Sequence, residues 1–169
     1  MNRTSSIAGS LAFLLVAPGT VAVYGPWLIS RWQMQTPLPH YAAFRILGVL
    51  LIIMGIPALL DSFARFALQG LGTPAPILPT KHLVVSGLYR YVRNPMYLGV
   101  AAAIFGQGIL LGDVRVLEYG SAVWLAFHLF VLLYEEPKLR SAFKEEYDRF
   151  CVDVPRWIPR MHPWRTGIM

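Results

Sequence analysis

Four long runs of apolar residues restrict the fold of this chain more than any other feature of the sequence. They cover about 7–29, 41–60, 95–111 and 116–134, and the second could continue to Leu68. A helix needs about 20 mainly apolar residues to cross the hydrocarbon core of a bilayer, and about 17 at the least. Helices also satisfy their own backbone hydrogen bonds, which lipid cannot do. The sequence therefore predicts an all-α integral membrane protein with about four transmembrane helices.

The composition agrees with a membrane protein. Of the 169 residues, 56% are hydrophobic and 14% are charged, whereas soluble domains carry roughly 25% charged residues. The first run resembles a signal peptide as far as Ala17, but its hydrophobicity continues to Trp27, so we predict a helix that spans the membrane and bends near Pro18. We expect one membrane domain over 1–169, with two N-terminal spans in 1–70. A Gly- and Pro-rich linker, 70–80, follows them.

The last two apolar runs are predicted to form a helical hairpin. Only the tight turn 112–115 separates them, so the fourth run must return antiparallel beside the third. Glycines at 99, 106, 108 and 112 make the third helix slender and allow a neighbour to pack closely. After the hairpin, apolar residues recur at helical spacing. These are Leu139, Phe143, Tyr147 and Phe150. They predict an amphipathic C-terminal helix that rests on the bilayer surface or on the basic loop before the third run.

The distribution of Lys and Arg predicts the orientation. With four spans, twelve of the 15 lie on the side of both termini, and three lie on the other. The basic excess marks the cytoplasmic side, so we expect an integral membrane protein (of the inner membrane if bacterial) with termini and active site cytoplasmic. The net charge of +6 flanks apolar segments. Membrane lipids with anionic headgroups, or an acidic small ligand, therefore fit it better than a nucleic acid does.

The segment 81–99, KHLVVSGLYRYVRNPMYLG, is the centre of the predicted site. Ser86-Gly87 indicates a turn. Asn94-Pro95 predicts the start of the third helix, since Asn is a favoured N-cap and Pro suits the first helical position. A helix N-terminus beside Arg93 would suit an anionic group. A basic loop that merely flanks the membrane is the alternative explanation.

The fourth run ends in Glu135-Glu136, which the hairpin brings to the same side as Asn94-Pro95. Two adjacent carboxylates at a membrane helix end need compensation by cations or hydrogen-bond donors. Lys138 and Arg140 could provide it in a purely structural role.

The histidines and the single cysteine give no clear sign of a metal site or a catalytic group. The four histidines share no tight spacing, so we predict no metal site. We interpret His128 as a packing histidine and Cys151 as an inert thiol, with functional roles as the alternatives.

Several of these motifs together carry a family resemblance. SGLYRYVRNPMYLG, the hydrophobic hairpin, EEPKL and FKEEYDRF occur in the order and separation of a known family. Over about 80–160 the chain resembles the integral-membrane methyltransferases, which include isoprenylcysteine carboxyl methyltransferases and phospholipid N-methyltransferases. The N-terminal spans match only in being hydrophobic.

The resemblance implies S-adenosylmethionine as the methyl donor and a lipophilic or small-molecule acceptor, with a carboxylate, amine or thiol as the accepting group. It assigns the cofactor to ten residues: Lys81, His82, Leu83, Val84, Tyr89, Asn94, Pro95, Met96, Tyr97 and Glu135. Glu135 is expected on the ribose hydroxyls, and Arg93, Asn94 and Tyr97 are implied to be catalytic. The family commonly has histidine at the position of Asn94. Val131 stands where eukaryotic isoprenylcysteine enzymes have an arginine.

Two other function classes remain open from the sequence. Sterol-type membrane reductases have a related C-terminal architecture and use a nicotinamide cofactor, although this chain lacks their long N-terminal part. A membrane subunit without enzymatic activity is the second alternative. Cofactor binding distinguishes all three.

Overall fold

The computed structural model describes residues 3–35, 42–68, 83 and 85–165. Predictions for the linker 70–80, for Lys81, His82 and Val84, and for the end of the loop after the first span lie outside these residues. The described part is helical and contains no strand, which confirms the predicted class. Its elements are α1 (Arg3–Gly19), the π-helical turn η1 (Thr20–Tyr24), α2 (Gly25–Ser30), α3 (Ala42–Leu68), the 3₁₀ helix η2 (Gly87–Arg90), α4 (Pro95–Leu111), α5 (Val114–Phe130), the π-helical turn η3 (Val131–Glu135) and α6 (Glu136–Asp153).

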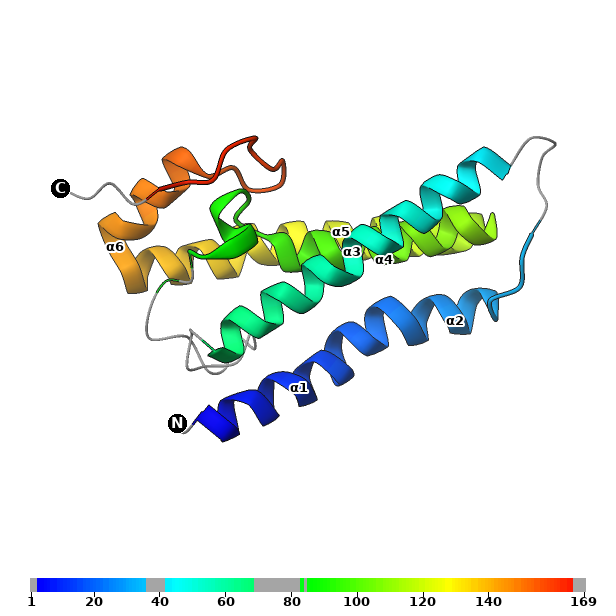
Figure 1. The fold of residues 1–169 in the computed structure, drawn as a ribbon, viewed down its shortest axis with the longest axis horizontal. Helices are drawn as coiled ribbons and strands as arrows, with labels where there is room; N and C mark the ends of the chain where they lie inside the picture. The colour runs from blue at the N-terminus through cyan, green and yellow to red at the C-terminus, as the bar shows by residue number, and fades with distance from the viewer. Residues whose placement is uncertain (1–2, 36–41, 69–82, 84, 166–169) are drawn as a thin grey trace.

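Three segments of the described chain are long and apolar enough to cross a membrane: Leu11–Ser30, Ala42–Arg65 and Val114–Asp153. Helix α4, Pro95–Leu111, is apolar but shorter. The count of four crossings therefore stays a prediction. In Figure 1, α1 and α2 run to one end of the bundle, α3 returns, α4 runs out again and α5 returns. The start of α1, η2 and α6 consequently lie at the same end.

Glycines allow α3 and α4 to approach closely. A Cβ atom on Gly55 would lie 2.8 Å from the carbonyl oxygen of Gly99, and one on Gly48 would lie 2.7 Å from that of Gly106. The two pairs are seven residues apart on each helix, so the antiparallel helices touch at two points along one stripe. Close backbone approach of this kind stabilises helix packing in lipid, where no hydrophobic force acts between helices. The slender face predicted for the third run therefore packs mainly on α3.

The predicted hairpin of α4 and α5 is confirmed. Gly112 has φ +70°, which a glycine adopts at little cost, and Asp113 begins α5 by accepting a hydrogen bond from the backbone N–H of Arg115 at 3.0 Å. Hydrogen bonds from the Arg115 side chain are the main reason why the pKa of Asp113 lies below its usual value. Gly108 lies against Leu117, so a second glycine contact closes the hairpin.

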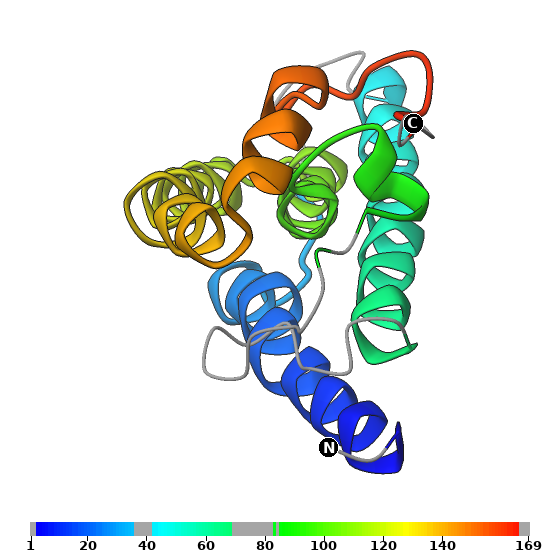
Figure 2. The same cartoon turned by 90° about the vertical axis from the view of Figure 1, so that its left-hand side faces the viewer.

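Helix α6 folds back over the end of the bundle, and the chain after it continues across the same end (Figure 2). It bends sharply at Lys144, whose φ is +47°. Tyr147, Phe150 and Val154 form a buried cluster, against which Leu83 and Val85 pack. This end of α6 therefore packs on the segment before η2, and the amphipathic character of the helix stays a prediction.

Candidate functional site

The candidate site lies where α4 begins and η3 ends, two segments that the hairpin brings together at the end of the bundle. There the phenol of Tyr97 donates a hydrogen bond to Oε2 of Glu135 at 2.7 Å. The ring of Tyr97 packs on Phe127 of α5, with 4.8 Å between ring centroids. The structure therefore joins two of the predicted site residues directly, across 38 positions of sequence.

The neighbouring Glu136 has different partners. Nη1 of Arg93 donates to its Oε1 at 3.0 Å, and Arg156 donates to both of its oxygens at 2.6 and 2.9 Å. The Glu136 side chain is 9% exposed. The hydrogen bond between Arg156 and Glu136 is the main reason why the pKa of Arg156 is raised, so the guanidinium of Arg156 stays charged. Glu136 is therefore a buried anion between two cations, whereas Glu135 pairs with a neutral phenol.

The segment after α6 is tied to the start of α4 by backbone hydrogen bonds. The N–H of Arg93 donates to the carbonyl of Pro155, and the N–H of Arg160 donates to that of Tyr91, both at 2.9 Å. The side chain of Asn94 donates to the carbonyl of Arg156 at 3.1 Å. Residues 154–164 thus cover the loop that leads into α4, although this segment is far away in the sequence.

Two predicted catalytic residues have structural partners. Asn94 stands at the N-cap position of α4, and the helix begins at Pro95 as predicted, but the Asn94 side chain makes no capping hydrogen bond. It is buried and holds the C-terminal segment instead. Arg93 contacts Glu136 and also donates to the sulfur of Cys151 at 3.0 Å. Its Nε is buried and has no hydrogen-bond partner in the described part of the chain.

The other predicted cofactor residues are placed at different depths. Tyr89 of η2 is buried and lies beside Ser62 of α3. Burial is the main reason why the pKa of Tyr89 is raised. Met96 packs against the main apolar core, and Leu83 against the cluster under α6. Pro95 is the buried first residue of α4. Lys81, His82 and Val84 lie outside the described residues, so of the predicted cofactor segment 81–84 only Leu83 is described.

His128 contacts two tryptophans, which agrees with the packing role predicted for it. The indole of Trp157 donates to its Nδ1 at 3.0 Å, and Trp124 stacks on its ring with 5.3 Å between centroids. A third aromatic contact, between the two tryptophans, completes the cluster. This cluster holds the C-terminal segment on α5.

Arg156 is the residue that the sequence analysis missed. Lys138 and Arg140 were the candidate cations for the two carboxylates, but the Nε of Arg140 donates to Asp148 at 2.7 Å, and Lys138 donates to the hydroxyl of Tyr134. The signal available in the sequence was the basic C-terminal segment, which follows a carboxylate pair lacking compensation. Without the fold, nothing in the sequence indicates which of its arginines reaches Glu136.

A family comparison decides the class of the protein. The family described as phospholipid methyltransferase matches residues 43–146, which is more than half of the chain and includes Tyr97, Glu135 and Glu136. The chain belongs to this family. It is also similar to Protein-S-isoprenylcysteine O-methyltransferase of Schizosaccharomyces pombe, with 36% identity over 78 residues. That match covers 46% of this chain and 33% of the yeast protein.

Together these likenesses confirm the predicted resemblance. Neither comparison favours the reductase alternative. The family match begins in α3 and ends in α6, so Arg156 and the segment that covers the site lie beyond it.

Proposed function

We propose that the protein transfers a methyl group from S-adenosylmethionine to a lipophilic or small-molecule acceptor at the membrane. The observation that carries the proposal is the Tyr97–Glu135 pair at the start of α4, in a chain of the phospholipid methyltransferase family. When bound, the donor supplies an electrophilic methyl group on a sulfonium ion. The protein then has to bind and orient the two reactants and keep water out.

Glu135 fits the ribose of the donor. Its Oε2 accepts from Tyr97, and no other described residue donates to the carboxylate. A carboxylate with acceptor capacity left is suited to a diol, and hydrogen bonds to a charged acceptor are the strong kind. The proposed role of Glu135 is therefore to hold the two ribose hydroxyls, with Tyr97 fixing the orientation of the carboxylate.

Arg93 fits an anionic group of a reactant. Its Nε is buried and has no partner among the described residues, which is unusual for a buried polar atom. It also stands directly before the N-terminus of α4, where the helix dipole favours negative charge. We assign Arg93 to the carboxylate of the donor or of the acceptor, and Glu136 holds the guanidinium in position.

The aromatic side chains fit the sulfonium. Tyr97 and Phe127 pack together beside Glu135, and the face of an aromatic ring attracts a cation by about 0.5–2 kcal/mol. Tyr89 lies close enough to Glu135 that the charge of Glu135 contributes to the raised pKa of Tyr89. The cofactor-binding roles of Leu83, Pro95 and Met96, and those of Lys81, His82 and Val84, remain part of the proposal.

A membrane site suits an acceptor that arrives from the bilayer. The related yeast protein is named for methylation of an isoprenylcysteine, a lipid-modified residue. In this chain the buried Val131 of η3 stands where eukaryotic isoprenylcysteine enzymes have an arginine for the substrate carboxylate. We therefore propose a lipophilic acceptor that is not restricted to prenylcysteine, with the site on the cytoplasmic side.

Two measurements on the purified full chain in detergent test the proposal. In calorimetry, S-adenosylmethionine or its demethylated product should bind, and a nicotinamide cofactor should not. Incubation of membranes with donor labelled in the methyl group should then give a labelled lipid or small molecule, and the variant Glu135→Gln should not. Binding of the nicotinamide cofactor alone would refute methyl transfer by this site.

A further inference from the structure

A groove of about 800 Å³ lies between α3 and α4 and is also lined by η2 and by Pro159 of the C-terminal segment. Its volume is typical of ligand sites, which occupy roughly 300–1,000 Å³. Met54 on its rim is 70% exposed and Ile53 is 59% exposed. Both belong to a segment apolar enough to span the membrane, so the groove opens toward lipid.

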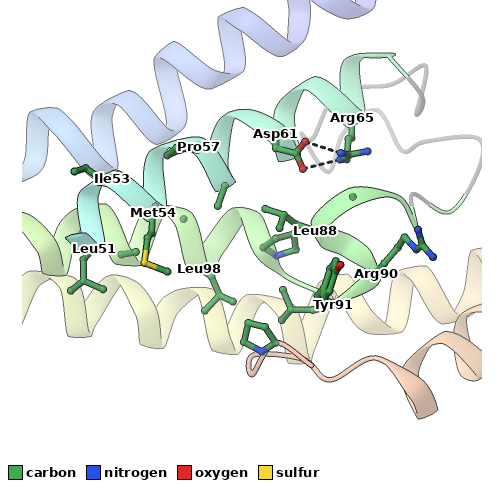
Figure 3. Close-up of a pocket in the computed structure, with 18 residues that line it drawn as sticks. Leu51, Ile53, Met54, Pro57, Asp61, Arg65, Leu88, Arg90, Tyr91 and Leu98 are labelled. Carbon is green, nitrogen blue, oxygen red and sulfur yellow. Dashed lines mark hydrogen bonds and ion pairs between the residues drawn. The ribbon is translucent and has the colours of Figure 1, made fainter. Parts of the chain in front are cut away.

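The polarity of the groove changes along its length (Figure 3). Leu51, Met54 and Leu98 line one end, and Asp61, Arg65 and Arg90 line the other. Asp61 and Arg65 form a bidentate ion pair with two contacts of 2.8 Å. Arg90 donates from Nε to the carbonyl of Trp164. Because Asp61 is the one carboxylate among the lining residues, the two guanidinium groups leave a net positive charge at this end.

The groove and the candidate site use different faces of α4. Pro95, Leu98, Gly99 and Ala102 have the spacing of one helix face and line the groove. Tyr97 turns to α5 and Glu135 instead. Apart from Pro95, no lining residue belongs to the predicted cofactor-binding set, so the groove differs from the site proposed for the methyl donor.

The polar end also lies beside side chains suited to a membrane surface. Ile158 and Met161, on either side of Pro159, are 77% and 90% exposed. Arg160 follows Pro159 directly, so apolar and cationic side chains alternate here. Such a mixture is typical of segments at the level of the lipid headgroups.

We propose that this groove binds an anionic phospholipid of the surrounding membrane. One acyl chain lies against Leu51, Met54 and Leu98, and the phosphate lies at Arg65 and Arg90. Among the described residues, none accepts a hydrogen bond from the terminal nitrogens of Arg90, so this guanidinium can donate to the phosphate. The lipid would bridge α3, η2 and α4 and so support the helix end that carries the candidate site.

The test compares two lipids with the same acyl chains on the full chain in neutral detergent. Dissociation constants for phosphatidylglycerol and phosphatidylcholine are measured by native mass spectrometry. Both lipids carry the phosphate, but the choline cation of phosphatidylcholine would lie beside the net positive end of the groove, where like charges repel. Wild type should therefore prefer phosphatidylglycerol by about tenfold, which corresponds to roughly 1.4 kcal/mol. Arg90→Gln should abolish this preference, and Arg149→Gln should keep it. Arg149 matches the charge change and lies on α6 in an exposed pair with Glu145.

Three further variants separate the contribution of charge to lipid binding from that of the acyl chain. Arg90→Lys keeps the cation and should keep most of the preference, although it loses the contact with Trp164. Asp61→Asn removes the carboxylate and should strengthen the preference for the anionic lipid. Met54→Trp fills the apolar end and should weaken both lipids alike. All variants should still bind S-adenosylmethionine, which separates this proposal from the proposed function.

Four results would overturn the lipid site. They are equal binding of the two lipids by wild type, equal losses in Arg90→Gln and Arg149→Gln, unchanged lipid binding in Met54→Trp, and displacement of phosphatidylglycerol by inorganic phosphate alone. The last result would indicate a site for a free anion.

Discussion

Replacement of Glu136 by Gln should destabilise the protein, whereas the same replacement of Glu135 should weaken binding of the methyl donor. Glu136 is buried between Arg93 and Arg156 and accepts three hydrogen bonds of 2.6–3.0 Å. Removal of one partner from a buried ion pair costs about 3–5 kcal/mol. Gln keeps one acceptor oxygen, and the side chain of Arg156 is 30% exposed. We therefore expect a loss of about 2–3 kcal/mol.

Thermal unfolding in detergent measures this loss. For a chain of this size, about 1 kcal/mol corresponds to roughly 2–4 °C in Tm, so Glu136→Gln should lower Tm by about 4–12 °C. The donor affinity of the folded fraction should fall less than in Glu135→Gln, because Glu136 acts on the donor only through the position of Arg93 and not through a contact with the ribose.

Glu135→Gln should give the opposite result. Its carboxylate has no cationic partner among the described residues, so Tm should stay within about 2 °C of wild type. Loss of a charge-assisted hydrogen bond to the ribose, about 1.5–3 kcal/mol, should raise the dissociation constant of S-adenosylmethionine by roughly ten- to a hundredfold. Both quantities are measured on the same samples. Equal effects of the two substitutions, on either quantity, would refute the separate roles of the two glutamates.

Three further predictions concern the fold. Gly55→Ala places a methyl group 2.8 Å from the carbonyl oxygen of Gly99 and should lower the free energy of unfolding by about 1–3 kcal/mol. Gly19→Ala is the control and should be tolerated, because the nearest atom to its methyl group lies at 3.6 Å. Equal Tm values of the two variants would contradict the close contact of α3 and α4. Asp113→Ala removes the cap of α5 and should cost about 1–2 kcal/mol at neutral pH. Since the pKa of Asp113 is lowered in the folded state, its contribution is present above the unfolded pKa and is lost as the pH falls below about 4, where variant and wild type should converge. Reporters fused at Met169 and at the turn 112–115 should lie on opposite sides of the membrane, and a C-terminal reporter outside the cytoplasm would overturn the predicted orientation.

Local sequence signals determined the helices and several of their boundaries. Pro95 begins α4 and Gly112-Asp113 separates it from α5, because the missing N–H of proline, the positive φ of glycine and the cap of aspartate act within a few residues. The pair of Asp61 and Arg65 was predictable for the same reason, since residues four apart share a helix face. The order of motifs also indicated the family.

Only the tertiary structure decided which partners the site residues have. Hairpin geometry predicted that Glu135 lies near the start of α4, but its bond to Tyr97 depends on the rotation of α4 against α5. Glu136 has Arg156 rather than Arg140 as a partner because α6 bends at Lys144 and the chain then returns over the bundle end. The pairing of Gly55 with Gly99 likewise depends on which helices become neighbours. Backbone signals act over a few residues, whereas these contacts depend on which helix faces are buried together, and no short stretch of the sequence encodes that choice.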